Sequence, residues 1–245
     1  MAEVKREYYE NGQLKSECFE IDGKKNGEYK RYYYNGQLEI ICSYIDDKLH
    51  GEYKQYYTDG QLKEICSYID DMRNGEYKSY YPNGQLWENC NFVDQYITGE
   101  GKRYHYYANG QIKENLSLKD GQFHGEIKKY YRNGQLESIC LYIEGVGKGG
   151  YTKYYENGQV KKQYSYMDDN MNGEYKEYYE NGQLKNICSY IDHKKNGEYK
   201  SYHANEKLKE ICSYIDDKKN GIYKEYHQNG ELYYTCSYVN GIQVE

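Results

Sequence analysis

The stretch Gly27–Leu38, GEYKRYYYNGQL, decides the fold of this 245-residue chain. Its dipeptide Asn35-Gly36 lies between two runs rich in tyrosine, isoleucine and other strand-forming residues. Asn-Gly between such runs is a strong hairpin signal, because a two-residue type I′ turn needs positive φ at both positions. The stretch therefore predicts a β-hairpin with Asn35-Gly36 as its loop. The expected cross-strand pairs are Tyr33 with Leu38, Arg31 with Ile40, and Tyr29 with Cys42.

The same turn recurs along the chain with a spacing of 24 residues, except for 26 between the fourth and fifth copies. The copies are Asn11-Gly12, Asn35-Gly36, Asp59-Gly60, Asn83-Gly84, Asn109-Gly110, Asn133-Gly134, Asn157-Gly158, Asn181-Gly182, Asn205-Glu206 and Asn229-Gly230. No segment has helical periodicity over eleven residues. We therefore expect an all-β fold: an elongated, single-layer antiparallel sheet of about ten stacked 24-residue hairpins, roughly 100 Å long from strand spacing.

The whole chain, residues 1–245, is predicted to be one repeat array that is irregular at 94–108 and 144–150. Alternation along the strands places Tyr29, Tyr33, Leu38, Cys42 and Tyr44 on one face of the hairpin. Glu28, Lys30, Tyr32, Ile41 and Ile45 are expected on the other face. The glycine-rich segment 144–150 lacks the spacing of a phosphate-binding loop and is interpreted as a flexible turn.

GEYKRYYYNGQL and GEYKEYYENGQLK (Gly173–Lys185), with their eight relatives, resemble the MORN repeat. They are most similar to its bacterial and giant-virus variant, and the resemblance runs from about Val4 to Asn240. It implies an array of β-hairpins, often with a scaffolding, self-association or membrane-tethering role, and no shared catalytic residue. The variant also includes antitoxin-like proteins. The eukaryotic unit is about one residue shorter and richer in glycine.

Composition excludes several classes of protein. The net charge is only −6, and lysines alternate with glutamates, which argues against an electrostatic nucleic-acid interface. No apolar run approaches the length of a membrane-spanning helix, and Met1–Tyr9 is too charged for a secretory signal. Thirty-eight tyrosines suit a half-exposed sheet, because their rings are apolar and their hydroxyls can stay hydrated.

All eight cysteines share one register of the repeat: Cys18, Cys42, Cys66, Cys90, Cys140, Cys188, Cys212 and Cys236. Equivalent positions in adjacent hairpins are expected about 10 Å apart, too far for a disulfide or a shared zinc ion. We therefore predict reduced, metal-free thiols that pack under the tyrosines. Their abundance fits a reducing, cytoplasmic compartment.

Neither the acidic pairs nor the histidines indicate a catalytic or metal site. Asp46-Asp47 and its equivalents fall in one turn of each repeat, which favours a role in turn formation over calcium binding. His203 and His227 replace a repeated tyrosine, and no histidine has metal-ligand spacing. The sequence predicts no catalytic residue, no metal and no cofactor.

The tyrosine rows are the one feature of the sequence that indicates a binding surface. Exposed tyrosines are common at protein interfaces, although cross-strand aromatic pairing also explains such rows. The candidate partner-binding residues are Tyr29, Tyr33, Tyr53, Tyr57, Tyr77, Tyr81, Tyr151, Tyr155, Tyr175, Tyr179 and Tyr199. Substitution of the usual pattern by Arg103, His105 and Ile127 is expected to kink or interrupt this surface.

The leading functional prediction is a non-enzymatic scaffold that binds a protein partner. Weak self-association through unpaired strand edges at the ends is also expected. The alternatives are an antitoxin-like inhibitor of a small protein and a membrane-associated tether. A tether is disfavoured, because the lysine row that includes Lys30 and Lys54 runs beside a glutamate row that includes Glu28 and Glu52.

Overall fold

The computed structural model describes residues 1–244, in which the chain forms strands and turns and no helix. Two compact units are distinguished. The first contains Met1–His105 and Ser117–Gln122, and the second contains Tyr106–Leu116 and the described residues from Phe123 onward. The boundary lies where the sequence carries its two extra residues.

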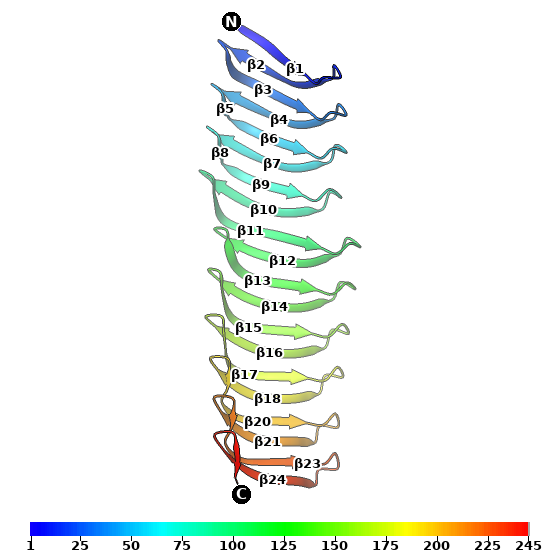
Figure 1. Cartoon of the computed structure of the whole chain (residues 1–245), viewed down its shortest axis with the longest axis vertical. Coiled ribbons are helices and arrows are strands. Elements are labelled where there is room, and N and C mark those ends of the chain that lie inside the picture. The colour runs from blue at the N-terminus through cyan, green and yellow to red at the C-terminus, as the bar shows by residue number, and fades with distance from the viewer. Residues whose placement is uncertain (245) are drawn as a thin grey trace. The chain divides into compact units, whose positions relative to one another are not determined.

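In the first unit, successive long strands pair antiparallel with one another, and each two-residue strand pairs with the long strand before it. Its strands are β1 (Ala2–Tyr8), β2 (Leu14–Ile21), β3 (Lys24–Tyr32), β4 (Leu38–Ile45), β5 (Lys48–Leu49), β6 (Gly51–Tyr56), β7 (Leu62–Ile69), β8 (Met72–Arg73), β9 (Gly75–Tyr80), β10 (Leu86–Val93) and most of β11 (Tyr96–Tyr106). Figure 1 shows these hairpins stacked in chain order.

The second unit repeats this arrangement. Its strands are most of β12 (Ile112–Lys119), β13 (Gln122–Tyr130), β14 (Leu136–Ile143), β15 (Val146–Tyr154), β16 (Val160–Met167), β17 (Asn170–Tyr178), β18 (Leu184–Ile191), β19 (Lys194–Lys195), β20 (Gly197–Tyr202), β21 (Leu208–Ile215), β22 (Lys218–Lys219), β23 (Gly221–Tyr226), β24 (Leu232–Val239) and β25 (Ile242–Val244). The predicted all-β fold of stacked antiparallel hairpins is thus confirmed within each unit.

The Asn-Gly loop differs from the predicted type I′ turn. The N–H of Gly36 donates to the carbonyl oxygen of Tyr33 at 2.9 Å, and only Gly36 of the loop has positive φ, at 83°. This is a three-residue loop, a type I turn followed by a left-handed glycine. Asn35 instead supplies its side-chain oxygen to the N–H of Gln37 at 3.0 Å, which stabilises the loop as an Asx turn.

This longer loop shifts the register at the strand ends. Tyr29 pairs with Cys42 and Arg31 with Ile40, as predicted. The predicted pairing of Tyr33 with Leu38 is wrong, because a β-bulge at Glu39 places Leu38 opposite Tyr32. Leu38 therefore lies on the face of Tyr32 rather than on that of Cys42.

The two-residue type I′ turn is found at the acidic pair instead. Asp46 and Asp47 have φ of 49° and 68°, and the flanking residues Ile45 and Lys48 pair with each other. Asp and Asn tolerate the left-handed region better than most residues. In segment 144–150, only Glu144-Gly145 forms this turn and the residues from Val146 onward belong to β15. The prediction of a flexible turn over the whole segment is therefore wrong.

These acidic turns also link successive repeats. The N–H of Asp47 donates to the carbonyl oxygen of Lys25 at 3.0 Å, and the Asp47 carboxylate accepts from the N–H of Lys25 at 2.8 Å. Asp71, Asp169 and Asp217 repeat the carboxylate contact on Leu49, Gly147 and Lys195 at 2.7–2.8 Å. Each turn thereby fixes the position of the turn in the preceding repeat.

The core is thin and composed largely of cysteine. Seven of the eight cysteines are buried, and in the first unit Cys66, Tyr77, Cys90 and Phe92 form a contiguous cluster. Cysteine behaves here as a small apolar side chain, which allows the rings on neighbouring strands to approach one another.

Candidate interaction surfaces

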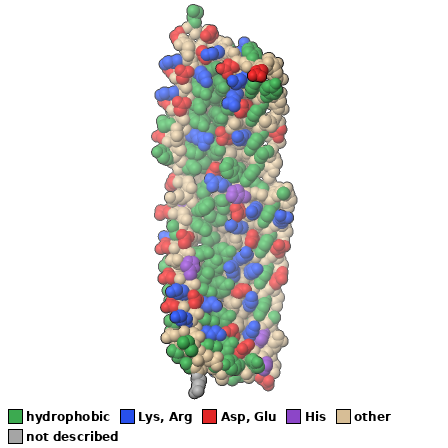
Figure 2. Space-filling view, in the orientation of Figure 1, with side chains coloured by type: hydrophobic (Ala, Val, Ile, Leu, Met, Phe, Trp, Pro, Cys, Tyr) green, Lys and Arg blue, Asp and Glu red, His purple; other side chains and the backbone are tan. Residues whose placement is uncertain are grey.

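One face of each hairpin carries the residues equivalent to Tyr29, Cys42 and Tyr44, and we call it the aromatic face. Tyr29 and Tyr44 meet edge to face with ring centroids 5.6 Å apart, and Tyr53 with Tyr68 and Tyr77 with Phe92 do so at the same separation. Tyr175 with Tyr190 and Tyr199 with Tyr214 continue the pattern in the second unit. Figure 2 shows hydrophobic side chains gathered in a stripe, with charged side chains beside it.

Cationic side chains lie over several of these aromatic pairs. The Nζ of Lys25 is 4.8 Å from the ring centre of Tyr29 and 4.9 Å from that of Tyr44. Arg73, Lys195 and Lys219 lie over their own pairs in the same way. Each contact is favoured by the negative face of the ring. Burial raises the pKa of Tyr77, Tyr190 and Tyr199 to about 12, so these hydroxyls stay protonated.

A second row of tyrosines, at the end of each first strand, ties one repeat to the next. The hydroxyl of Tyr33 donates to the carbonyl oxygen of Tyr56 at 2.7 Å, and Tyr57 donates to Tyr80 at the same distance. Tyr9, Tyr81, Tyr107, Tyr131, Tyr155 and Tyr179 make the equivalent bond at 2.7–3.3 Å. His203 keeps it, with its Nε2 2.9 Å from the Tyr226 oxygen.

Replacing Tyr131 with phenylalanine tests this tie. The substitution keeps the ring but leaves the Tyr154 carbonyl without the donor now 2.7 Å away. We expect the free energy of unfolding to fall by about 1 kcal/mol, the usual net value of such a bond. Urea denaturation measures the change, and Tyr96→Phe is the control because Tyr96 is 76% exposed. Equal stability of the two variants would show that the hydrogen bond from Tyr131 to Tyr154 does not stabilise the fold.

The eleven predicted partner-binding tyrosines therefore fall into two rows. Tyr29, Tyr53, Tyr77, Tyr151, Tyr175 and Tyr199 belong to the aromatic pairs, and Tyr33, Tyr57, Tyr81, Tyr155 and Tyr179 belong to the ties. All eleven are buried or half-buried. In the second unit, Ile127 occupies the equivalent position of Tyr29 and is buried at 7% exposure.

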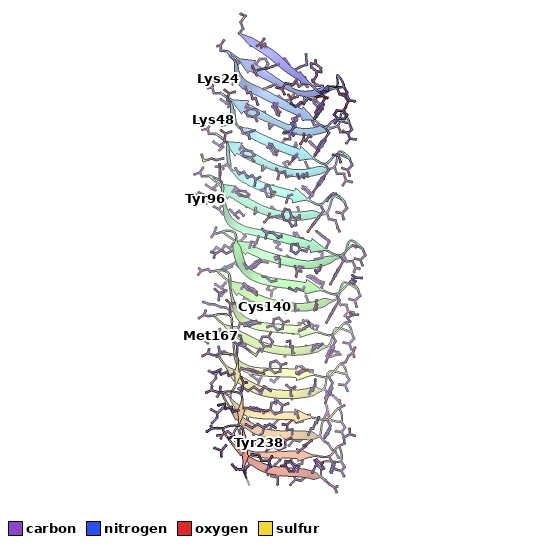
Figure 3. The ribbon with its side chains drawn as sticks, in the orientation of Figure 1. Lys24, Lys48, Tyr96, Cys140, Met167 and Tyr238 are labelled. Carbon is purple, nitrogen blue, oxygen red and sulfur yellow. The ribbon has the colours of Figure 1, made fainter. Side chains whose placement is uncertain are left out.

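Sequence reasoning missed the most exposed apolar row. It consists of the last residue of the second strand of every hairpin except that of β12, which ends in Lys119, and we call it the aliphatic row: Ile21, Ile45, Ile69 and Val93 in the first unit, and Ile143, Met167, Ile191, Ile215 and Val239 in the second. Their exposed fractions run from 37% to 63%. In Figure 3, Met167 is labelled at the edge of the sheet where the acidic turns lie, whereas Cys140 lies over the middle of the strands. The signal in the sequence was the apolar residue that directly precedes all but one of these turns.

The opposite, charged face is electrostatically balanced. Lys30, Lys54, Lys176 and Lys200 each lie 2.5 Å from the glutamate two residues earlier, and Lys78 and Lys128 do so at 2.8 and 2.7 Å. Such exposed pairs add little stability, but they cancel the field of the lysine row. The described residues include no helix that could cross a membrane.

All eight cysteines are free. Burial raises the pKa of Cys42, Cys66 and Cys90 to about 11, which leaves little reactive thiolate near neutral pH. Within residues 1–244, no three His, Cys, Asp or Glu side chains are grouped to hold a metal ion.

These thiols should differ in reactivity. Cys236 is half-buried and the other seven are buried. We therefore expect a maleimide to modify Cys236 at least about ten-fold faster than any other cysteine of the folded protein at pH 7.5. Timed quenching and peptide mass spectrometry measure the rates. Uniform labelling, or faster labelling of Cys66, would contradict the packing described.

Comparison with known proteins gives a family. A family model described as a MORN repeat variant matches residues 4–19, 25–46, 49–70, 73–94, 99–120, 123–144, 149–168, 171–192, 195–216 and 219–240. No curated protein matches the chain.

Solved structures of toxin complexes show a weak similarity. Crystal structures of TcdB2-TccC3-Cdc42 and TcdB2-TccC3-TEV cover 96% of this chain at 11% and 12% identity, each with a TM-score of 0.26. The Photorhabdus luminescens Tc holotoxin pore covers 98% at 12% identity, also with a TM-score of 0.26. The chain spans only 14–18% of those chains, and similarity at this level supports no inference. The ten family matches, in contrast, take in most of the sequence, and the chain belongs to the MORN repeat variant family, whose repeats typically bind proteins or membranes.

Proposed function

We propose that this chain is a non-enzymatic scaffold that binds a protein partner along the aliphatic row of the second unit. The observation that carries the proposal is that the second strand of every hairpin from β14 to β24 ends in an exposed aliphatic side chain, such as Met167 at 63% and Ile191 at 57%. Apolar side chains aligned on a rigid sheet lose unfavourable contact with water when a partner buries them.

The aliphatic row is favoured over the tyrosine rows by accessibility. The hydroxyls of Tyr155 and Tyr179 are already bonded to the next repeat, and Tyr199 is paired with Tyr214 under Lys195. A partner that used these rings would have to displace those contacts. The tyrosine surface predicted from the sequence is therefore kept as the alternative binding surface.

A paired set of variants in the same two repeats separates the surfaces. The first variant is Ile191→Ser with Ile215→Ser, at side chains that are 57% and 51% exposed. The second is Tyr175→Ala with Tyr199→Ala, on the aromatic face. A partner is first captured from the native source with the unaltered chain, and its affinity for both folded variants is then measured. We expect the isoleucine variant to bind at least about ten-fold more weakly, as for an interface anchor.

If the isoleucine variant binds almost normally and the tyrosine variant binds weakly, the partner binds the aromatic face and not the aliphatic row. If the captured protein is a small toxin whose activity falls on binding, the antitoxin-like alternative gains support. Membrane tethering is disfavoured by the cancelled charge of the Lys30 and Lys54 row. Co-sedimentation with anionic vesicles at physiological salt would revive that alternative.

Weak self-association is a second part of the proposal. Among the described residues, β24 pairs with β25 only through Ser237, Tyr238 and Val239, while Leu232 and Tyr233 are 52% and 63% exposed. An unpaired strand edge favours addition of another strand. We expect sedimentation equilibrium to give a mass that rises with concentration, and Tyr233→Lys to lower it towards the monomer. A monomer mass that stays constant as the protein concentration rises would contradict self-association.

A further inference from the structure

One position of the repeat places a cationic side chain over the aromatic pair in four repeats, and we call it the covering position. Its occupants are Lys25, Leu49, Arg73, Ile97, Phe123, Gly147, Met171, Lys195 and Lys219. Four are cations, and their charged groups lie 4.0–5.5 Å from ring centres of the pair beneath. The site over an aromatic pair thus accepts a lysine or arginine head group in these four repeats, while Leu49 and Met171 occupy the same position in two others.

Gly147 is the one occupant without a side chain, and its backbone geometry matches that of the cationic repeats. Its N–H donates to the Oδ1 of Asp169 at 2.7 Å, as the N–H of Lys25 donates to Asp47 and that of Lys195 to Asp217 at 2.8 Å. The rings below it, Tyr151 and Tyr166, meet edge to face with centroids 6.2 Å apart. The aromatic pair is therefore present, but its covering side chain is missing.

A hollow of about 320 Å³ lies against these two rings. Its lining includes Cys140, Tyr142, Tyr151 and Tyr166, with Glu137 and Lys153 at one end. The equivalent hollow of the first repeat, which Lys25 helps to line, measures only about 110 Å³. A volume of this size accommodates a small organic group rather than a single water molecule.

The charges of the side chains that line the hollow are balanced by ion pairs. Its two lysines are already paired, Lys153 with Glu137 at 3.1 Å and Lys129 with Glu114 at 2.9 Å. The Asp169 carboxylate lies beside Gly147, where Asp47 and Asp217 lie beside the backbone of Lys25 and Lys195. Lys162 lies over Tyr164 and Tyr151 at 5.5 and 5.8 Å but does not line the hollow.

We propose that the hollow at Gly147 binds an organic cation, a primary ammonium or guanidinium group on a short alkyl chain. The rings of Tyr142, Tyr151 and Tyr166 contact the alkyl chain and the cationic head, and Asp169 supplies the opposing charge. The cation takes the place that Lys25 and Lys195 take in their own repeats. The site is separate from the aliphatic row, so failure of either proposal leaves the other intact.

Ligand-observed NMR on the full chain tests the site with n-butylammonium, n-butylguanidinium and the neutral n-butanol. We expect saturable binding of both cations, and at least about ten-fold weaker binding of butanol. Gly147→Lys supplies the cation that other repeats carry and should reduce cation binding at least ten-fold. Lys25 and Lys195 make the same N–H bond to an aspartate, so the backbone here accepts a side chain once the Asp169 carboxylate, whose Oδ1 lies 3.0 Å from the position of the new Cβ, shifts by a few tenths of an ångström.

The reciprocal variant creates a second site. Lys195→Gly removes the cation over Tyr199 and Tyr214 and leaves the same aromatic residues as at Gly147, with Tyr190 and Asp217 at the positions of Tyr142 and Asp169. The Lys195→Gly variant should bind two cations per chain, whereas the unaltered chain binds one. Butanol binding as tightly as butylammonium, absence of binding by both cations, or cation binding unchanged in both folded variants would each overturn the proposal.

A blocked tripeptide with a central lysine identifies the source of the cation. If it binds the unaltered chain at least as tightly as butylammonium, the natural occupant is a side chain of a protein partner. If the tripeptide is rejected while butylammonium binds, the occupant is a free small molecule. Gly147→Lys must abolish whichever binding is seen, because the lysine fills the hollow.

Discussion

Replacing Tyr77 with alanine is expected to lower the free energy of unfolding by about 3 kcal/mol, the range seen when a buried aromatic side chain is truncated. Tyr77 is only 7% exposed and belongs to the cluster with Cys66, Cys90 and Phe92. Its hydroxyl donates to Glu64 at 3.1 Å, and Arg73 lies 5.0 Å above its ring. All of these contacts are lost in the alanine variant.

Urea denaturation followed by circular dichroism measures the loss. Tyr96→Ala is the matched control, since that ring is 76% exposed and surface substitutions usually change stability by less than about 0.5 kcal/mol. A cost below about 1 kcal/mol for Tyr77→Ala would show that the tyrosines do not form the core. The result also bears on partner binding, because a tyrosine that the fold requires is a poor site for mutational mapping.

Stability is expected to collapse between pH 9 and pH 12. Burial raises the pKa of Cys42, Cys66 and Cys90 to about 11 and that of Tyr77, Tyr190 and Tyr199 to about 12. The folded chain therefore holds protons that the unfolded chain releases nearer pH 9 to 10. The stabilisation is fully present below those unfolded values and is lost as the pH rises through the folded ones.

Each group contributes at most about 1.4 kcal/mol per pH unit, and less where its side chain is partly solvated. Several such groups acting together make the fall steep. The urea midpoint, measured at intervals from pH 7 to pH 12, should be flat to about pH 9 and then decline. Removal of one group in Cys66→Ala should make the decline shallower, after its own offset at pH 7 is subtracted. A midpoint unchanged up to pH 12 would contradict the account.

The repeat and its hairpins could be predicted from the sequence because turn dipeptides and strand-forming runs recur at a fixed spacing. The pairs Tyr29 with Cys42 and Arg31 with Ile40 followed from counting outward from Asn35-Gly36. The type of the Asn35-Gly36 turn was predicted wrongly, however. Asn-Gly suits both a two-residue loop and a three-residue loop with a left-handed glycine, and the sequence alone does not distinguish them.

The functional surfaces were harder to predict, because the role of a tyrosine depends on what its hydroxyl reaches in the next repeat. The 2.7 Å bond from Tyr33 to Tyr56 joins residues 23 positions apart and has no local sequence signal. The hollow at Gly147 likewise appears only when equivalent positions are compared in space. The exposure of Ile45 could have been inferred from its place before Asp46-Asp47, since an apolar residue next to a turn has few neighbours.

Hydroxyl-radical footprinting of the captured complex tests most directly the claim that the partner binds the aliphatic row while the tyrosines hold the repeats together. In the free chain, Met167 at 63% exposure should be oxidised quickly and the half-buried Tyr175 slowly. On binding, oxidation of the aliphatic row, with Met167, Ile191 and Ile215 as reporters, should fall several-fold, and that of Tyr175 and Tyr199 should not change. Protection of Tyr175 and Tyr199 with the aliphatic row still freely oxidised would contradict the claim.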